Sequence, residues 1–550
     1  MTERIKKLKE MQNAVKPSIS AERAVLATEA IEKYAFFPPV LQKAYMLRYI
    51  LENMTVFIQE GELLVGNHTS RPRCTPVYPE FNSQWILEQM EDFPVRGTDP
   101  LIVPYEDKKA LMEVLPKWKG ISLDQTLEEA LPEKAKYAEK CGILTMGNRD
   151  CGTGHVLPDY YNLIRKGLVY YKEKCKKLID ETEVDCKEKQ EKVDFWNSVI
   201  ITIDAARIFA NRYSILAENM AEKENDDKRK QELLEISRIC KKVPYEPAES
   251  FYEAVQFVWF IHLIINIESN GHGNSYHRFD QYMNEFYVND LKNGTIIEER
   301  AIEILDCFFI KNTDIIKLRD KFYSESFAGY PMWQNIIVGG QKPDGSDATN
   351  ETSFLVLKAN RDVHTSSPTA SVRYFDGINK ELMEESLKMI QDGLATPAFF
   401  NDKLVVPMVM DKQGVSVEEA RNWGIMGCVQ PVVAGYTDGR PTVGYVNLLK
   451  CLELVIHNGI NPIDGKQLGP QTGDFRKFTN LEQLQEALYK QISYFADLMI
   501  TGFNIVGAMH AARTPMVFTS MVVNDSIDKG LPIQCGGARY SESGAFMCGI

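Results

Sequence analysis

The chain has 550 residues, of which 44% are hydrophobic and 10% aromatic, well above the values typical of disordered proteins. The net charge of −13 argues against nucleic-acid binding, because phosphate binding needs a basic face. The first residues lack the apolar core of a signal peptide, and the 11 cysteines include no CxxC pair. These features predict a reduced, cytoplasmic protein without a disulfide framework, a zinc ribbon or an iron–sulfur site of its own.

The first part of the chain is predicted to be helical. Ser20 has the form of an N-cap before a run of helix formers. Residues 167–196 and 219–242 are rich in Lys and Glu and predict helices with solvated charged faces, and the charge run 226–230 predicts an exposed turn. The apolar stretch 254–267 is too short to span a bilayer and predicts a buried helix, so no membrane association is expected.

From about Tyr330 short apolar runs alternate with helical segments. The predicted strands are 333–340, 365–375 and 396–400, and the predicted helices are 380–393, 416–422 and 481–502. Strands that alternate with helices of this length favour parallel βαβ units. Because no repeat or linker divides the chain, the sequence predicts one large α/β body behind a helical N-terminal region.

Residues 423–435 (WGIMGCVQPVVAG) place one cysteine in a glycine-rich loop. Cys428 follows an apolar run and Gly427, an arrangement that would present a thiol from a strand end into a cavity. A lone cysteine is more often a small buried hydrophobe. Thiolate catalysis also needs a histidine or a positive neighbourhood, which no motif supplies here. The residues alone therefore leave the role of this loop open.

Several sequence blocks together resemble the glycyl radical enzymes of the pyruvate formate-lyase type. GCVQP at 427–431 is similar to the GCVEP active-site loop of that family. Further blocks follow in the family's order across nearly the whole chain. They are GELLVGN at 61–67, YPEF at 78–81, TGHVLPDY at 153–160, ESNGHGNSYHRFDQY at 268–282, WQN at 333–335, DATNE at 347–351 and GGARY at 536–540.

The resemblance implies a fold and a chemistry. The fold is an α/β barrel of two parallel half-sheets surrounded by helices. An iron–sulfur, S-adenosylmethionine-dependent activase makes a radical on a backbone glycine, and this radical passes to Cys428, whose thiyl abstracts hydrogen from a small-molecule substrate. Such a cysteine needs shielding from water and oxygen more than a lowered pKa. The resemblance further implies a homodimer and no tightly bound cofactor.

The chain ends at Ile550 without the RVxGY-like glycyl loop of the family. We therefore expect residues 1–550 to be a pyruvate formate-lyase-like domain truncated at its C-terminus, with an incomplete second half-barrel and no glycyl radical residue. The glycyl loop would belong to a separate polypeptide or to a lost part of the gene. The chain alone is expected to be inactive.

The active loop also departs from the diol dehydratases that the family contains. Gln430 stands where they carry a proton-transferring Glu, a group of a kind worth about 10²–10⁴ in rate. Gly273 replaces a Ser of the glycerol-type enzymes, and Thr442 replaces a substrate-contacting Asp. Three polar substrate contacts are changed together, which disfavours a standard diol or glycerol dehydratase.

Five residues are the candidates for substrate binding. Arg440 has a fork suited to a carboxylate, although an exposed loop arginine is the alternative. Gln430 can orient a substrate. His155 is a candidate hydrogen-bond donor, and His272 and Ser275 lie in a turn that could line the cavity. For these last three, a structural role is the alternative.

The predicted activity is anaerobic C–C or C–X bond cleavage of the lyase or decarboxylase type on a small carboxylated substrate. Pyruvate formate-lyase itself is disfavoured, because its loop has two adjacent cysteines and Gly427 precedes Cys428 here. A fumarate-adding or dehydratase-type glycyl radical enzyme is one alternative, and a catalytically silent remnant is another. An ordinary cysteine hydrolase is the least favoured.

Overall fold

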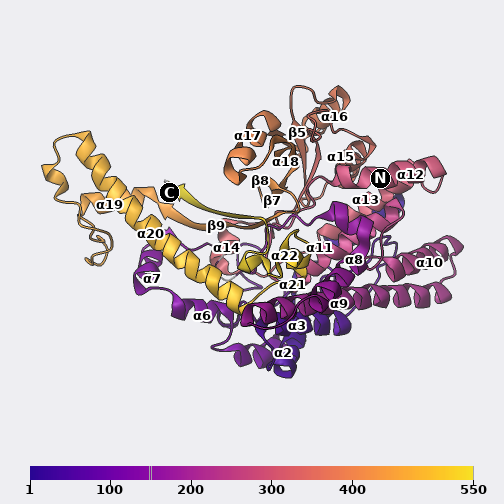
Figure 1. Ribbon diagram of the computed structural model, residues 1–550, viewed down its shortest axis with the longest axis horizontal. Helices are drawn as coiled ribbons and strands as arrows, with labels where there is room; N and C mark the ends of the chain where they lie inside the picture. Colours follow the sequence, from indigo (N-terminus) through magenta and orange to yellow (C-terminus); the bar gives the residue numbers. More distant parts are fainter. Residues whose placement is uncertain (148, 150, 549–550) are drawn as a thin grey trace.

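The computed structural model describes residues 1–147, 149 and 151–548, except for the side chains of 441–443, 543 and 545–547. Thr442, predicted to replace an acidic substrate contact, therefore lies outside the described side chains. Figure 1 shows a helical body, an upper lobe of strands and helices, and a long helix (Leu481–Arg513) that extends from the body to the left.

Helices dominate the first 330 residues. They are α1 (Glu3–Ala14), α2 (Glu22–Tyr34), α3 (Pro39–Asn53), α4 (Gln84–Glu88), α5 (Tyr105–Val114), α6 (Leu123–Ala130), α7 (Glu133–Lys140), α8 (Tyr160–Asp180), α9 (Lys187–Lys223), α10 (Asp227–Lys242), α11 (Phe251–Glu268), α12 (Phe279–Asn293), α13 (Glu298–Asn312) and α14 (Lys321–Ser326). Every residue of α11 is buried, which confirms the predicted buried helix. The charged segment 226–230 is not a turn, because Asp226 caps α10 by accepting a hydrogen bond from the Arg229 backbone.

The later helices alternate with strands, as predicted. The helices are α15 (Glu351–Val363), α16 (Lys380–Gln391), α17 (Asp402–Gln413), α18 (Val417–Ala420), α19 (Leu448–Ile456), α20 (Leu481–Arg513), α21 (Val517–Met521) and α22 (Ser526–Lys529). The strands among the described residues are β1 (Ser18–Ser20), β2 (Cys74–Pro76), β3 (Leu144–Thr145), β4 (Asn335–Gly339), β5 (Thr369–Tyr374), β6 (Ala398–Asn401), β7 (Trp423–Met426), β8 (Gln430–Val433), β9 (Thr437–Asn447) and β10 (Tyr540–Cys548).

The strands form small sheets. The parallel sheet β4-β5-β6 lies in the upper lobe, where α15–α18 accompany it (Figure 1). A second sheet has the order β10-β9-β3, with β10 parallel and β3 antiparallel to β9. β7 and β8 form an antiparallel hairpin. The α/β class with parallel strands is thus confirmed, while the assembly of two half-sheets into a barrel stays a prediction.

Helix α20 runs from the left end of the molecule, where it begins beside α19, towards the helical body (Figure 1). One stripe of its residues is buried, from Ala487 to His510, against a core cluster that includes residues of α6, α7 and β9. Among the described residues it is the one helix whose length and hydropathy would suffice to cross a membrane, and 22% of its most apolar window is buried.

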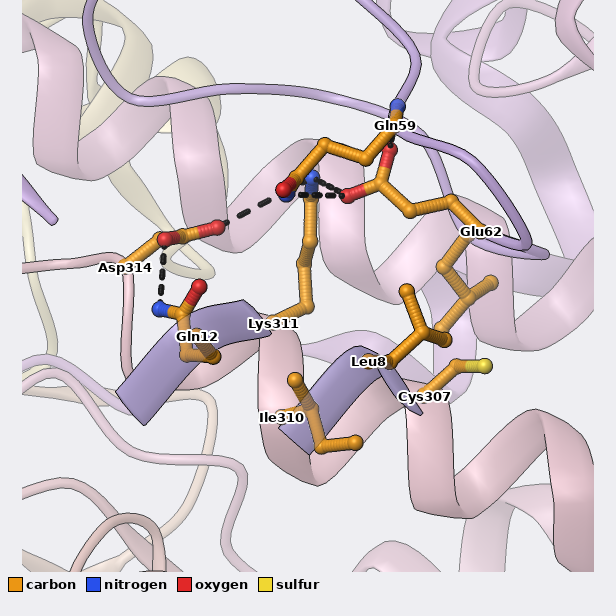
Figure 2. A pocket seen from close by; sticks show the side chains of 9 residues that line it. Leu8, Gln12, Gln59, Glu62, Cys307, Ile310, Lys311 and Asp314 are labelled. Atoms are coloured by element: carbon orange, nitrogen blue, oxygen red, sulfur yellow. Dashed lines mark hydrogen bonds and ion pairs between the residues drawn. The ribbon is translucent and has the colours of Figure 1, made fainter. Parts of the chain in front are cut away.

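A buried ionic cluster joins the N-terminal helix to the body (Figure 2). Gln12 of α1 donates to Asp314 (2.6 Å), and Lys311 of α13 pairs with Glu62. Gln59 donates its side-chain amide to Glu62 (3.1 Å). The cluster lines a cavity of about 10 Å³, room for about one water molecule. None of its lining residues is a candidate site residue, so we assign this cluster to stability.

Candidate functional site

Cys428 lies at the tip of the β7–β8 hairpin. Met426 pairs with Gln430 across the hairpin, and Gly427 starts the turn with φ +61°, a conformation that favours glycine. Residues of β7 are buried, but Cys428 is exposed and Gln430 is half-buried. The described residues therefore shield the thiol only in part, because the tip of a hairpin has few neighbours on its outer side.

Two hydrogen bonds hold the backbone of Gly427, the residue that precedes Cys428. The Gly427 N–H donates to the Gly273 carbonyl oxygen (2.9 Å), and the Asn335 side-chain amide donates to the Gly427 carbonyl oxygen (2.5 Å). Ser371 donates to the other end of the Asn335 amide (3.2 Å). Ser275 accepts from the Asn335 backbone N–H (3.1 Å). The Ser275 hydroxyl thus helps to position Asn335, which in turn contacts Gly427.

His155 packs directly on the cysteine turn. A Cβ placed on Gly427 would lie 2.3 Å from the His155 ring, and one on Gly273 would lie 2.8 Å from it. Burial lowers the pKa of His155 to about 3, so the ring is neutral. The sequence analysis made His155 a candidate substrate-binding residue but did not expect a histidine against the cysteine turn. The contact explains why glycines occupy positions 273 and 427.

His272 lies on the other side of His155, with ring centroids 5.2 Å apart. Arg319 donates to its Nδ1 (3.0 Å), so Nε2 carries the proton and faces the Tyr323 hydroxyl at 3.5 Å. Burial, followed by the positive charge of Arg319, lowers the pKa of His272 well below its usual value. Trp333 packs on the ring at 4.7 Å. Sequence reasoning missed Arg319 and Tyr323, because no motif marks them.

Arg440 lies on β9, and its Nη2 donates to the Thr153 hydroxyl (3.3 Å). Burial lowers its pKa to about 10, so the guanidinium is still charged at neutral pH. It forms no ion pair with any carboxylate that the structure describes. An isolated bridge between Gly154 and Gly439 joins β9 to the segment that carries His155. Arg440 is therefore linked to the cysteine turn through that segment.

The electrostatics of Cys428 suit hydrogen-atom transfer. Partial burial of Cys428 raises the pKa of its thiol to about 11, so the thiol stays protonated at neutral pH. A thiolate nucleophile needs the opposite shift. The described residues contain no group of three or more His, Cys, Asp or Glu side chains that could hold a metal ion.

A buried network supports the end of α11, from which the His272 segment leaves. Arg23 donates to the Ile267 carbonyl oxygen (2.9 Å) and pairs with Glu80 (2.7 Å), which also pairs with Lys43 (2.9 Å). Burial alone raises the pKa of Glu80, but the two cations outweigh it and lower the pKa to about 2. Charge compensation of this kind fixes the path of the chain into the site.

Comparison with known proteins identifies the family. The family model described as pyruvate formate lyase-like matches residues 1–550. The chain belongs to the pyruvate formate lyase-like family. Trans-4-hydroxy-L-proline dehydratase of Clostridioides difficile is 33% identical, covering 98% of this chain and 68% of that protein. Isethionate sulfite-lyase of Desulfovibrio desulfuricans is 32% identical, covering 92% of this chain and 63% of that protein.

A solved structure shares the fold closely. The glycerol-bound form of the B12-independent glycerol dehydratase from Clostridium butyricum has a TM-score of 0.96 and 38% identity, covering 100% of this chain and 69% of that one. This pyruvate formate lyase-like chain thus spans about two thirds of the length of such relatives. The resemblance to glycyl radical enzymes that the sequence blocks predicted is confirmed.

Proposed function

We propose that this protein is the Cys428-bearing part of a glycyl radical enzyme that cleaves a C–C or C–X bond of a small carboxylated molecule under anoxic conditions. The radical is supplied by a glycyl residue outside residues 1–550, installed by an iron–sulfur, S-adenosylmethionine-dependent activase. That glycyl residue lies in a separate polypeptide or in a further part of the same gene product. The working assembly is a cytoplasmic homodimer.

What supports the proposal above all is Cys428 itself. It lies in the GCVQP turn, its thiol is kept protonated with a pKa of about 11, and the backbone of the preceding Gly427 is held by Gly273 and Asn335. As a thiyl it takes a hydrogen atom from a substrate C–H bond and becomes a thiol. The substrate radical then loses its leaving group, and the product radical takes the hydrogen atom back from Cys428.

Arg440 supports an anionic substrate. A charged, half-buried guanidinium without a carboxylate partner among the described residues suits a carboxylate delivered by the substrate. Gln430, half-buried on β8, orients the substrate and transfers no proton. His155 and His272 are neutral and line the same region, each able to donate one hydrogen bond.

A dehydratase is the second candidate, because two of the relatives named above are dehydratases. Dehydration needs a group that protonates the departing hydroxyl, and Gln430 does not supply it. A fumarate-adding enzyme and a silent remnant are the remaining alternatives. Product analysis separates these four: carbon dioxide or another cleaved fragment, water loss, a succinate adduct, or no product.

The test uses the protein as its gene encodes it, with its activase, S-adenosylmethionine and any glycyl-loop polypeptide encoded beside it, under anoxia. We expect a glycyl doublet in the electron paramagnetic resonance spectrum and consumption of a small acid. Cys428→Ala should keep the doublet and abolish consumption. Cys535→Ala, which removes another exposed thiol, should change neither. Turnover by Cys428→Ala would refute the assignment.

A further inference from the structure

Two opposite charges lie side by side on β9 without pairing to each other. Asp438 and Arg440 are two positions apart, so their side chains leave the same face of the strand, roughly 7 Å apart at the backbone. Asp438 is 9% exposed and Arg440 is half-buried. Neither side chain forms an ion pair among the described residues. Buried charges are normally paired, so this arrangement needs an explanation.

The neighbours of Asp438 do not neutralise it. Ser541, its partner on β10, donates a hydrogen bond to it. Lys529 of α22 is the other cation that Asp438 senses, but its ammonium donates to the carbonyl oxygens of Gly536 (3.0 Å) and Ala538 (2.6 Å). Burial raises the pKa of Asp438 to about 6, which is the sign of a carboxylate that lacks a full counter-charge.

The pair lies beside the candidate site. Gly439, the residue between the two charges, bridges to Gly154, and His155 next to it packs on the cysteine turn. Arg440 reaches the Thr153 hydroxyl of the same segment. A molecule held between Asp438 and Arg440 would therefore contact the segment that supports Cys428.

We propose that Asp438 and Arg440 together bind the ammonium and carboxylate groups of an α-amino acid. This inference rests on the proposed function and narrows its substrate class from small acids to zwitterions. Arg440 takes the carboxylate through its fork, and Asp438 takes the ammonium, so that each charge acquires the counter-charge that the described residues do not provide. The preference for an amine beside the acid is set by Asp438.

The test measures binding without a radical, so its outcome is independent of turnover. Each common L-amino acid is titrated into the unactivated protein by calorimetry. Any amino acid that binds is compared with its two matched analogues; for L-valine these are 3-methylbutanoate and 2-methylpropylamine. We expect the amino acid to bind about tenfold or more tightly than either analogue, because each lacks one charge-assisted contact. Failure of every amino acid to bind overturns the proposal.

Two variants and a pH series assign the contacts. Asp438→Asn, which keeps the shape of the side chain, should weaken the amino acid about tenfold and leave the carboxylate analogue unchanged or tighter. Arg440→Gln should weaken both. In the wild type, amino-acid affinity should fall as pH drops through about 6, where Asp438 gains a proton, while affinity for the carboxylate analogue should not fall. Equal losses for the amino acid and the carboxylate analogue in Asp438→Asn, or no pH dependence, overturn the assignment.

Discussion

Asn335 should control the order of the cysteine turn. Its side-chain amide lies 2.5 Å from the Gly427 carbonyl oxygen, and Gly427 is buried. Asn335→Ala leaves that oxygen without its partner, at a cost of about 1–3 kcal/mol. If the cost falls on local opening of the hairpin, amide exchange in residues 423–433 should accelerate about 5- to 150-fold.

Hydrogen exchange followed by mass spectrometry measures this directly, and two variants serve as comparisons. Ser371→Ala removes only the hydrogen bond to the other end of the Asn335 amide, so it should accelerate exchange far less. Asn335→Asp replaces the donor by a carboxylate that faces a carbonyl oxygen, so it should be as damaging as Asn335→Ala at neutral pH. In the active enzyme the expected loss is in kcat rather than KM, since misplacement of a reacting atom by about 1 Å costs about 10²-fold. Unchanged exchange in Asn335→Ala would refute the reasoning.

Three further predictions concern Glu80, Gly427 and Gln430. Glu80→Gln should be less stable than the wild type by about 3 kcal/mol at neutral pH. In thermal unfolding the wild type should lose this advantage as pH falls from 4.5 towards about 2, because protonation of Glu80 removes the negative charge that the two cations stabilise. Gly427→Ala should lower the melting temperature far more than Gly414→Ala: both have positive φ, but only at Gly427 would the new Cβ meet another side chain. Gln430→Glu should lower turnover if Gln430 only orients the substrate; a gain in water elimination would favour the dehydratase.

Part of this protein could be predicted from local sequence alone. The buried helix α11, the strand β4 with its Gly-Gly end and the placement of Cys428 in a turn all follow from apolar runs and glycine positions within about twenty residues. The family blocks likewise lie within short stretches. Such features depend on residues that are close together in the sequence, so they can be predicted from a single sequence.

Only the tertiary structure decided how the site is built. Asn335 and Gly427 are in contact although 92 positions separate them in the sequence, and Arg319 contacts His272 over 47 positions. No local sequence pattern therefore predicts either contact. The exposure of Cys428 and the lack of an ion pair for Asp438 among the described residues likewise depend on which segments pack nearby. The chemical type of each side chain can be taken from the sequence. The burial of a side chain and its hydrogen-bond and ionic partners depend on the path of the whole chain, and they determine its protonation state and its position.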